Sequence, residues 1–167
     1  MTKFIKSLSY LHRELEELYL PPEETKVVLN GQVIPFSVIK GTRGYLEKLT
    51  HQINATYKNS CYDACGVLIR RLVETLVIEC FELNGFNHKI ENANGDYFFL
   101  KDLIDVMLQQ TWKLSRNFKR DIQKLKDVGD KSAHSKTYIA NRQDIDDIIP
   151  SLRLVVQEMI ILSGMKK

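Results

Sequence analysis

Long apolar runs are missing from this sequence of 167 residues. A bilayer-spanning helix needs roughly 20 apolar residues, and the longest apolar run, residues 154–162, is interrupted by Gln157 and Glu158. The first twenty residues lack the apolar core of a secretory signal, because they contain Arg13, Glu14, Glu16 and Glu17. These absences argue against a membrane span and against export, so we expect a cytoplasmic protein.

Cysteine is also scarce, with three residues at positions 61, 65 and 80. An odd number without an export signal argues against a disulfide framework. Cys61 and Cys65 stand at the helical spacing of four, but no second Cys/His pair is placed to complete a metal site. We therefore expect free, buried thiols, and we predict neither a metal nor a cofactor.

The chain has little excess charge of either sign, with a formal net charge of +3. The exception is residues 113–136, where eight basic residues stand against three acidic ones. Such a strip is usually a solvated helix face, but it also suits a phosphate-bearing ligand. The candidate nucleic-acid-binding residues are Lys113, Arg116, Lys119, Arg120, Lys124 and Lys131.

The rest of the sequence is dominated by apolar residues at helical spacing. A capping box of Ser60 with Asp63 is expected to open the longest helix, which Asn84-Gly85 would end. The ranges predicted as helical are 4–20, 45–57, 60–83, 98–108, 111–128 and 141–164.

Residues 25–40 have a different character. Asn30-Gly31 lies between two β-branched runs, a strong signal for a β-hairpin because both turn positions favour positive φ. Pro35 would make the second strand an edge strand or end it early. The alternative is an extended arm that docks on another subunit. The expected domains are residues 1–42, an N-terminal helix with a hairpin or arm, and residues 43–167, a helical domain.

The long helix predicts one unusual ion pair. Arg70 and Glu74 stand four residues apart, with Val67, Val77, Ile78 and Phe81 on both sides of them around the helix. Because desolvation of each charge costs several kcal/mol, a partly buried pair suggests that these residues orient a polar loop or serve a site. The alternative is an ordinary pair at the edge of the exposed face, with Arg71, Thr75, Glu79 and Glu82.

The stretch from Lys126 to His134 is predicted to be a break between two helical patterns. Gly129 suits the position after a helix end, and Asp130 could cap the next turn through the amide of Ser132 or Ala133. His134 could act as a base, a phosphate donor or a buried hydrogen-bond partner.

The last helix has a clear expected start. Asn141 and Asp144 have the spacing of an N-cap with its reciprocal acid, and Pro150 predicts a kink or restart. Three acidic residues in this region could suggest a metal, but acids in a first turn also complement the helix dipole, which we favour. They are Asp144, Asp146 and Asp147.

Taken together, these motifs resemble an uncharacterised prokaryotic family of the broad HEPN-like (higher eukaryotes and prokaryotes nucleotide-binding) superfamily. The resemblance covers about residues 43–164 and rests on the following motifs: Tyr62-Asp63-Ala64, Arg70-x-x-x-Glu74, Gly129-Asp130-x-Ser132-Ala133-His134 and Asp144-Ile145-Asp146. It implies an all-α bundle of about five helices, here with an N-terminal helix and a small β-hairpin, that often forms homodimers.

Many HEPN-like proteins are metal-independent ribonucleases of toxin or defence systems, and the resemblance implies how such a site would be built. Its arginine and histidine position the scissile phosphate and assist the ribose 2′-hydroxyl. Asp130 and His134 match the polar residue and the histidine, but Gly129 stands at the arginine position, and the nearest upstream base is Lys126. Lysine lacks the planar fork of arginine.

Three functions therefore remain open. The favoured one is a non-catalytic HEPN-like binding or regulatory domain, linked to prokaryotic defence, that dimerises and contacts RNA or nucleotide. Its structural polar network would contain Arg70, Glu74, Asp130, Ser132 and His134. The second is a ribonuclease with His134, Lys126 and Asp130 as catalytic residues, or with Arg70 as the electrostatic partner. The third is an interaction module that binds a protein partner through residues 25–40.

Overall fold

Helices make up most of residues 31–166, the part of the chain that the computed structural model describes. They pack as a bundle, and this range contains no β-strand, although an isolated antiparallel bridge joins Glu91 to Tyr97. The mainly α fold is therefore confirmed. The elements are α2 (Phe36–Ile39), α3 (Gly44–Lys58), α4 (Tyr62–Leu83), the 3-10 turn η1 (Asn87–Lys89), α5 (Leu100–Leu108), α6 (Phe118–His134), α7 (Arg142–Asp146) and α8 (Ile149–Ser163).

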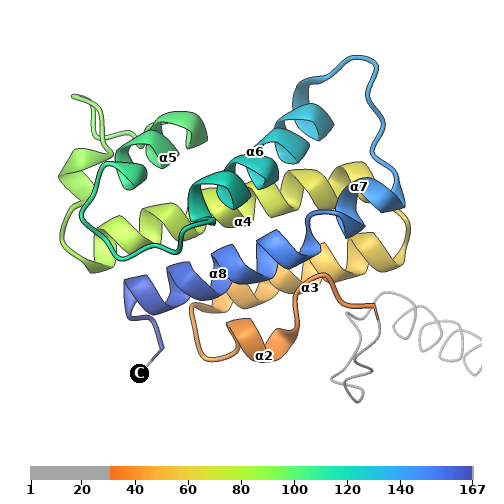
Figure 1. Ribbon diagram of the computed structural model, residues 1–167, viewed down its shortest axis with the longest axis horizontal. Helices are drawn as coiled ribbons and strands as arrows, with labels where there is room; N and C mark the ends of the chain where they lie inside the picture. The colour runs from red at the N-terminus through yellow and green to blue at the C-terminus, as the bar shows by residue number, and fades with distance from the viewer. Residues whose placement is uncertain (1–30, 167) are drawn as a thin grey trace, which may run out of the picture. The chain divides into compact units, whose positions relative to one another are not determined.

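Helix α4 is central to this bundle. It packs against α3, α6 and α8, while α5 and α7 lie near its two ends (Figure 1). Most of its apolar residues are buried, which explains the central position, since a helix that is apolar on several sides needs several neighbours. The buried residues of α4 include Cys65, Ile69, Leu72, Val73, Leu76, Val77, Cys80 and Phe81.

The predicted hairpin at residues 25–40 is wrong for the portion that the structure describes. Val33 and Ile34 lie in a bend and are completely buried, and Phe36–Ile39 then forms the short helix α2. Pro35 precedes the first turn of α2, where its fixed φ and missing N–H favour a helix start over a strand. Residues 25–30 and the helix expected at residues 4–20 lie outside the described residues.

Two side chains hold the backbone of residues 32–34. Asn54 of α3 accepts from the Ile34 N–H (3.0 Å) and donates to the Ile34 carbonyl (2.8 Å). Arg153 of α8 donates to the carbonyls of Val33 (3.0 Å) and Gln32. These bonds satisfy backbone groups that would otherwise be buried without partners.

The ends of α7 and α8 follow the sequence closely. The capping box of Asn141 and Asp144 is confirmed, with the Gln143 and Asp144 amides donating to the Asn141 side chain. The chain restarts as α8 with Pro150 in its first turn, as expected, and Gly164 ends α8 in the left-handed conformation with φ of 68°.

The start of α4 differs from the prediction. Cys61 occupies the N-cap position without a side-chain cap bond, and Ser60 adopts a positive φ of 60°. Asp63 instead accepts a 2.9 Å hydrogen bond from the Ala140 amide. This carboxylate therefore ties the chain before α7 to the start of α4.

Candidate functional site

The stretch from Lys126 to His134 is helical, so the predicted break is wrong. Helix α6 runs without interruption to His134 and is followed by Ser135 in an extended conformation. Gly129, expected just after a helix end, lies in the last third of α6 and is buried. Asp130 is likewise inside the helix and does not cap a new one.

Gly129 is explained by the contact between α4 and α6. A Cβ at this position would lie 2.4 Å from Arg70 Cβ and 3.1 Å from the Gly66 carbonyl oxygen. Neither atom can move without the backbone of α4, because the Gly66 oxygen belongs to that backbone and Arg70 Cβ is bonded directly to it. Gly66 faces α6 in the same way, where its Cβ would meet Ser132 Oγ at 2.6 Å. The two glycines allow the helices to approach closely.

A polar cluster lies beside this contact. Arg70 Nε donates to Asp130 Oδ1 at 2.7 Å, and Lys126 Nζ donates to Asp130 Oδ2 at 2.6 Å. Arg70 Nη1 is 3.4 Å from Glu74 Oε2, so the predicted Arg70–Glu74 pair is confirmed. Exposed fractions of these four side chains range from 15% to 31%. We call Arg70, Glu74, Lys126 and Asp130 the α4–α6 cluster.

The α4–α6 cluster holds Asp130 in its charged form. Burial alone would raise the pKa of this carboxyl, but hydrogen bonds from Lys126 and Arg70, together with their charges, outweigh burial and lower the pKa. Both carboxylate oxygens are occupied by cations. An acid arranged in this way is suited to joining two helices and poorly suited to accepting a proton from a substrate.

This pKa predicts an acid-dependent loss of stability. A carboxyl whose pKa is lower in the folded than in the unfolded chain stabilises the fold above its unfolded value, near 4, and this contribution disappears as pH falls through the folded value. We expect Asp130→Asn to be less stable than the wild type at neutral pH and the difference to shrink below about pH 4. Urea unfolding at several pH values measures it; a difference independent of pH would contradict the assignment.

Ser132 and His134 do not join the network that the sequence suggested. Within residues 31–166, neither side chain has a hydrogen bond to Arg70, Glu74 or Asp130. Ser132 Oγ is buried against Gly66 without a partner in this range. His134 is exposed in the last turn of α6.

The three candidate catalytic residues lie on successive turns of α6. Lys126, Asp130 and His134 are spaced by four residues, so each step covers about 6 Å along the axis, and His134 lies about 12 Å beyond Lys126. Lys126 is bound to Asp130, whereas His134 is free of this pair. The structure therefore brings two of them together and leaves the histidine apart.

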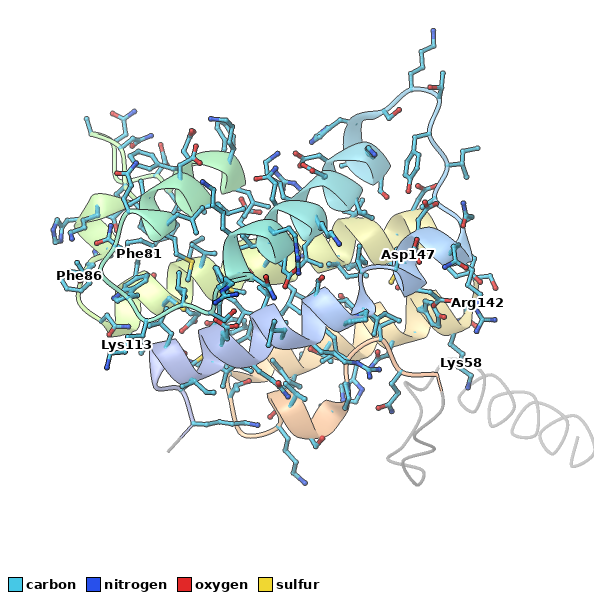
Figure 2. All side chains as sticks on the ribbon, in the orientation of Figure 1. Lys58, Phe81, Phe86, Lys113, Arg142 and Asp147 are labelled. Carbon is cyan, nitrogen blue, oxygen red and sulfur yellow. The ribbon has the colours of Figure 1, made fainter. Side chains whose placement is uncertain are left out.

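The basic strip is exposed, as expected for phosphate contacts, but it does not form one face. Arg120, Lys124 and Lys131 follow one side of α6, with Lys124 and Lys131 about 10 Å apart along the axis. Lys119 lies on another side, and Lys113 and Arg116 precede the helix, which begins at Phe118 and not at the predicted residue 111. Figure 2 places Lys113 at the end of the bundle that holds Phe81 and Phe86, away from Arg142 and Lys58.

Most basic side chains of residues 113–136 form no ion pair within the described part of the chain. In the described part of the chain, Lys126 pairs with Asp130 and Arg120 with Asp121 (3.2 Å). No carboxylate within this part lies at ion-pair distance from the remaining basic side chains of residues 113–136. These are Lys113, Arg116, Lys119, Lys124, Lys131 and Lys136.

Glu79 is a charged residue that the sequence pattern places wrongly. The pattern predicts it on the exposed face of the long helix, but it is 4% exposed and lies 3.6 Å from Arg43, the N-cap residue of α3. Burial raises the pKa of Glu79, and the charge of Arg43 opposes this. A helical wheel of α4 alone could not reveal it, because α3 covers that side.

The residues considered as metal ligands have other roles. Cys65 and Cys80 are buried, with pKa values raised by burial to about 11 and about 12, whereas Cys61 is exposed and departs from the expectation. Asp144 completes the capping box, and Asp146 accepts from Tyr57. Among residues 31–166, no three His, Cys, Asp or Glu side chains gather as they would around a metal ion.

Comparison with known proteins adds no assignment. No family model matches the chain, and neither a curated protein nor a solved structure matches it. The helices of residues 31–166 include none that is both long and apolar enough to cross a membrane.

Proposed function

We propose that this chain is a HEPN-like, non-catalytic binding domain that contacts RNA or a nucleotide through the exposed cations on and before α6. The mainly α bundle and the placement of the Arg70–Glu74 pair beside Gly129-Asp130 support the resemblance to that superfamily. The proposal includes a cytoplasmic location. It also includes self-association as a homodimer and a link to prokaryotic defence, which the resemblance implies.

One observation carries the binding function. Two of the three acidic residues of α6 are engaged by cations, Asp130 by Arg70 and Lys126, and Asp121 by Arg120, with a further bond from the Ser151 hydroxyl. The third, Asp127, is exposed and accepts from the Gln123 side chain at 2.8 Å. The excess positive charge therefore rests on exposed lysines such as Lys124 and Lys131. Exposed, unpaired cations in a row bind phosphates by releasing counterions, without dependence on base sequence.

Cleavage is disfavoured by the surroundings of Gly129. The arginine expected there in a HEPN ribonuclease has no room, because even a Cβ would collide with Arg70. Arg70 brings a guanidinium to the same place, but it is bound to Asp130 and Glu74. A phosphate would have to displace both carboxylates before it could use this cation.

We expect neutralisation of the outer lysines to weaken binding. Lys124→Gln/Lys131→Gln should lower the affinity for a labelled single-stranded RNA roughly tenfold or more at low salt. It should also reduce the salt dependence, by about 0.7 in the slope of log K against log salt for each phosphate that is no longer bound. Filter binding across a salt series measures both.

The matched control is Lys48→Gln/Lys58→Gln, which removes the same charge from exposed positions on α3. It should leave affinity and slope close to wild type. Absence of RNA and DNA affinity at low salt, or equal weakening by both double variants, would contradict the proposal.

A ribonuclease that uses His134 is the second candidate, and the exposure of this side chain favours it. His134 lies in the last turn of α6, one turn after Lys131, so a phosphate could reach both. In this alternative, Lys131 would be the cation that binds the scissile phosphate, because Lys126 and Arg70 are both paired with Asp130. Cleavage that disappears in His134→Ala would distinguish it from binding alone.

A further inference from the structure

The chain between η1 and α5 folds back on itself and leaves one backbone edge open. It projects from the bundle beside α5 (Figure 1). Residues 90–92 and 96–98 run antiparallel, joined by backbone hydrogen bonds of 2.8 and 2.9 Å on either side of the bridge between Glu91 and Tyr97. In this pattern the N–H and C=O groups of Tyr97 point away from Glu91. Within residues 31–166 neither group has a hydrogen-bond partner, so this edge can pair with another backbone.

Two aromatic side chains stand at this edge. Phe98 packs against the apolar core, and in an extended chain its neighbours Tyr97 and Phe99 therefore face the opposite way. Phe99 is 81% exposed and Tyr97 is 41% exposed. The Tyr97 hydroxyl donates to Glu82 of α4, so this ring is already held in place. The edge thus offers a fixed aromatic surface to a partner.

The surroundings of this edge are acidic. From residue 82 to residue 105, five acidic residues stand against two lysines. The hydrogen bond from Tyr97 to Glu82, burial and the charges of nearby glutamates raise the pKa of Tyr97 to about 12. In the part of the chain that the structure describes, no lysine or arginine lies at ion-pair distance from Glu82, Glu91 or Asp96. This face therefore attracts cations and repels phosphates.

We propose that the open edge at Tyr97 binds an extended, cationic segment of a protein partner. The backbone of that segment pairs with the N–H and C=O groups of Tyr97, as when a strand is added to a sheet. Its arginine or lysine side chains lie over the rings of Tyr97 and Phe99, because the face of an aromatic ring attracts cations. Glu82 and Glu91 supply the charge that selects such a segment over an acidic one.

The inference does not depend on nucleic-acid binding, and its test contains no RNA. The probe is an acetylated and amidated hexapeptide of alternating arginine and valine, titrated to millimolar concentration into ¹⁵N-labelled full-length protein. We expect saturable shifts of the amide resonances of residues 96–99. Exchange of the Tyr97 amide with solvent should slow in the complex, because this N–H gains a partner. A hexapeptide of alternating glutamate and valine should cause no saturable shift.

Variants at the edge separate this surface from general attraction. Phe99→Ser removes the more exposed ring, and Glu82→Gln/Glu91→Gln removes two charges; each should weaken binding of the arginine peptide roughly threefold or more. Ile161→Ser is the matched control, because Ile161 of α8 is 78% exposed, and it should bind as the wild type does. Absence of saturable shifts, shifts confined to residues outside 82–105, or equal binding by Phe99→Ser and Ile161→Ser overturns the proposal.

Discussion

Replacing Gly129 with alanine is expected to lower the free energy of unfolding by about 2 kcal/mol or more, a large effect for one methyl group. The new Cβ would lie 2.4 Å from Arg70 Cβ, so α4 and α6 must separate. Alanine is the better helix former by about 1 kcal/mol, and the collision must exceed this gain. Urea unfolding of the two proteins measures the difference.

Gly66→Ala is the matched control, because it adds the same methyl group to the partner helix at the same contact. Its obstacles are Ser132 Oγ at 2.6 Å, a hydroxyl that can rotate away, and Ser132 Cβ at 3.2 Å, which needs a shift of only a few tenths of an ångström. We expect a much smaller loss, within about 1 kcal/mol, because the gain in helix propensity offsets part of the strain. Equal losses in the two variants would show that the close approach at Gly129 is not what requires a glycine.

The second large effect is expected at Asn54. Asn54→Ala removes both partners of the buried Ile34 backbone, leaving one N–H and one carbonyl without hydrogen bonds. A buried unsatisfied group costs about 1–3 kcal/mol, so the stability should fall by about 2–3 kcal/mol. Protection of the Ile34 amide against hydrogen exchange should fall with it.

Gln52→Ala, two residues earlier on an exposed position of α3, is the control and should change stability by less than about 0.5 kcal/mol. If Asn54→Ala were equally neutral, the packing of the aliphatic side chains Val33 and Ile34 would be enough to hold this segment. The two asparagine hydrogen bonds would then have no energetic role.

The helices were predictable where the chain carries its own signals. The capping box at Asn141, the restart at Pro150 and the end at Gly164 depend on local chemistry, and each appears in the structure. The Arg70–Glu74 pair was predictable for the same reason, since it needs only the geometry of one helix. These signals are sufficient for the mainly α class.

Contacts between helices explain why the predictions for Gly129 and Glu79 were wrong. Gly129 resembles a helix end in sequence, but the same residue is required where Arg70 of α4 presses against α6. Glu79 appears exposed on a wheel of α4 until Arg43 and α3 cover it. Arg70 and Arg43 are both distant in sequence from the residues that they contact, so local patterns predicted a helix end at Gly129 and exposure of Glu79.

Residues 30–34 show how turn signals can mislead. Asn30-Gly31 and two β-branched runs favour a hairpin, yet Val33 and Ile34 find their hydrogen-bond partners in side chains of α3 and α8. A short run of aliphatic residues looks the same in sequence whether its backbone pairs with a strand or with side chains of neighbouring helices. The candidate site was only partly predictable. Arg70 and Lys126 both bind Asp130, while Ser132 and His134 lie outside these hydrogen bonds.

The central claim is that this chain binds RNA and leaves it intact. The most direct test incubates an end-labelled single-stranded RNA with wild type and with His134→Ala in EDTA, at a salt concentration where filter binding shows the RNA to be bound. We predict full-length RNA in both reactions, because the guanidinium of Arg70 and the ammonium of Lys126 are held by Asp130. Cleavage by the wild type that is lost in His134→Ala would contradict the claim.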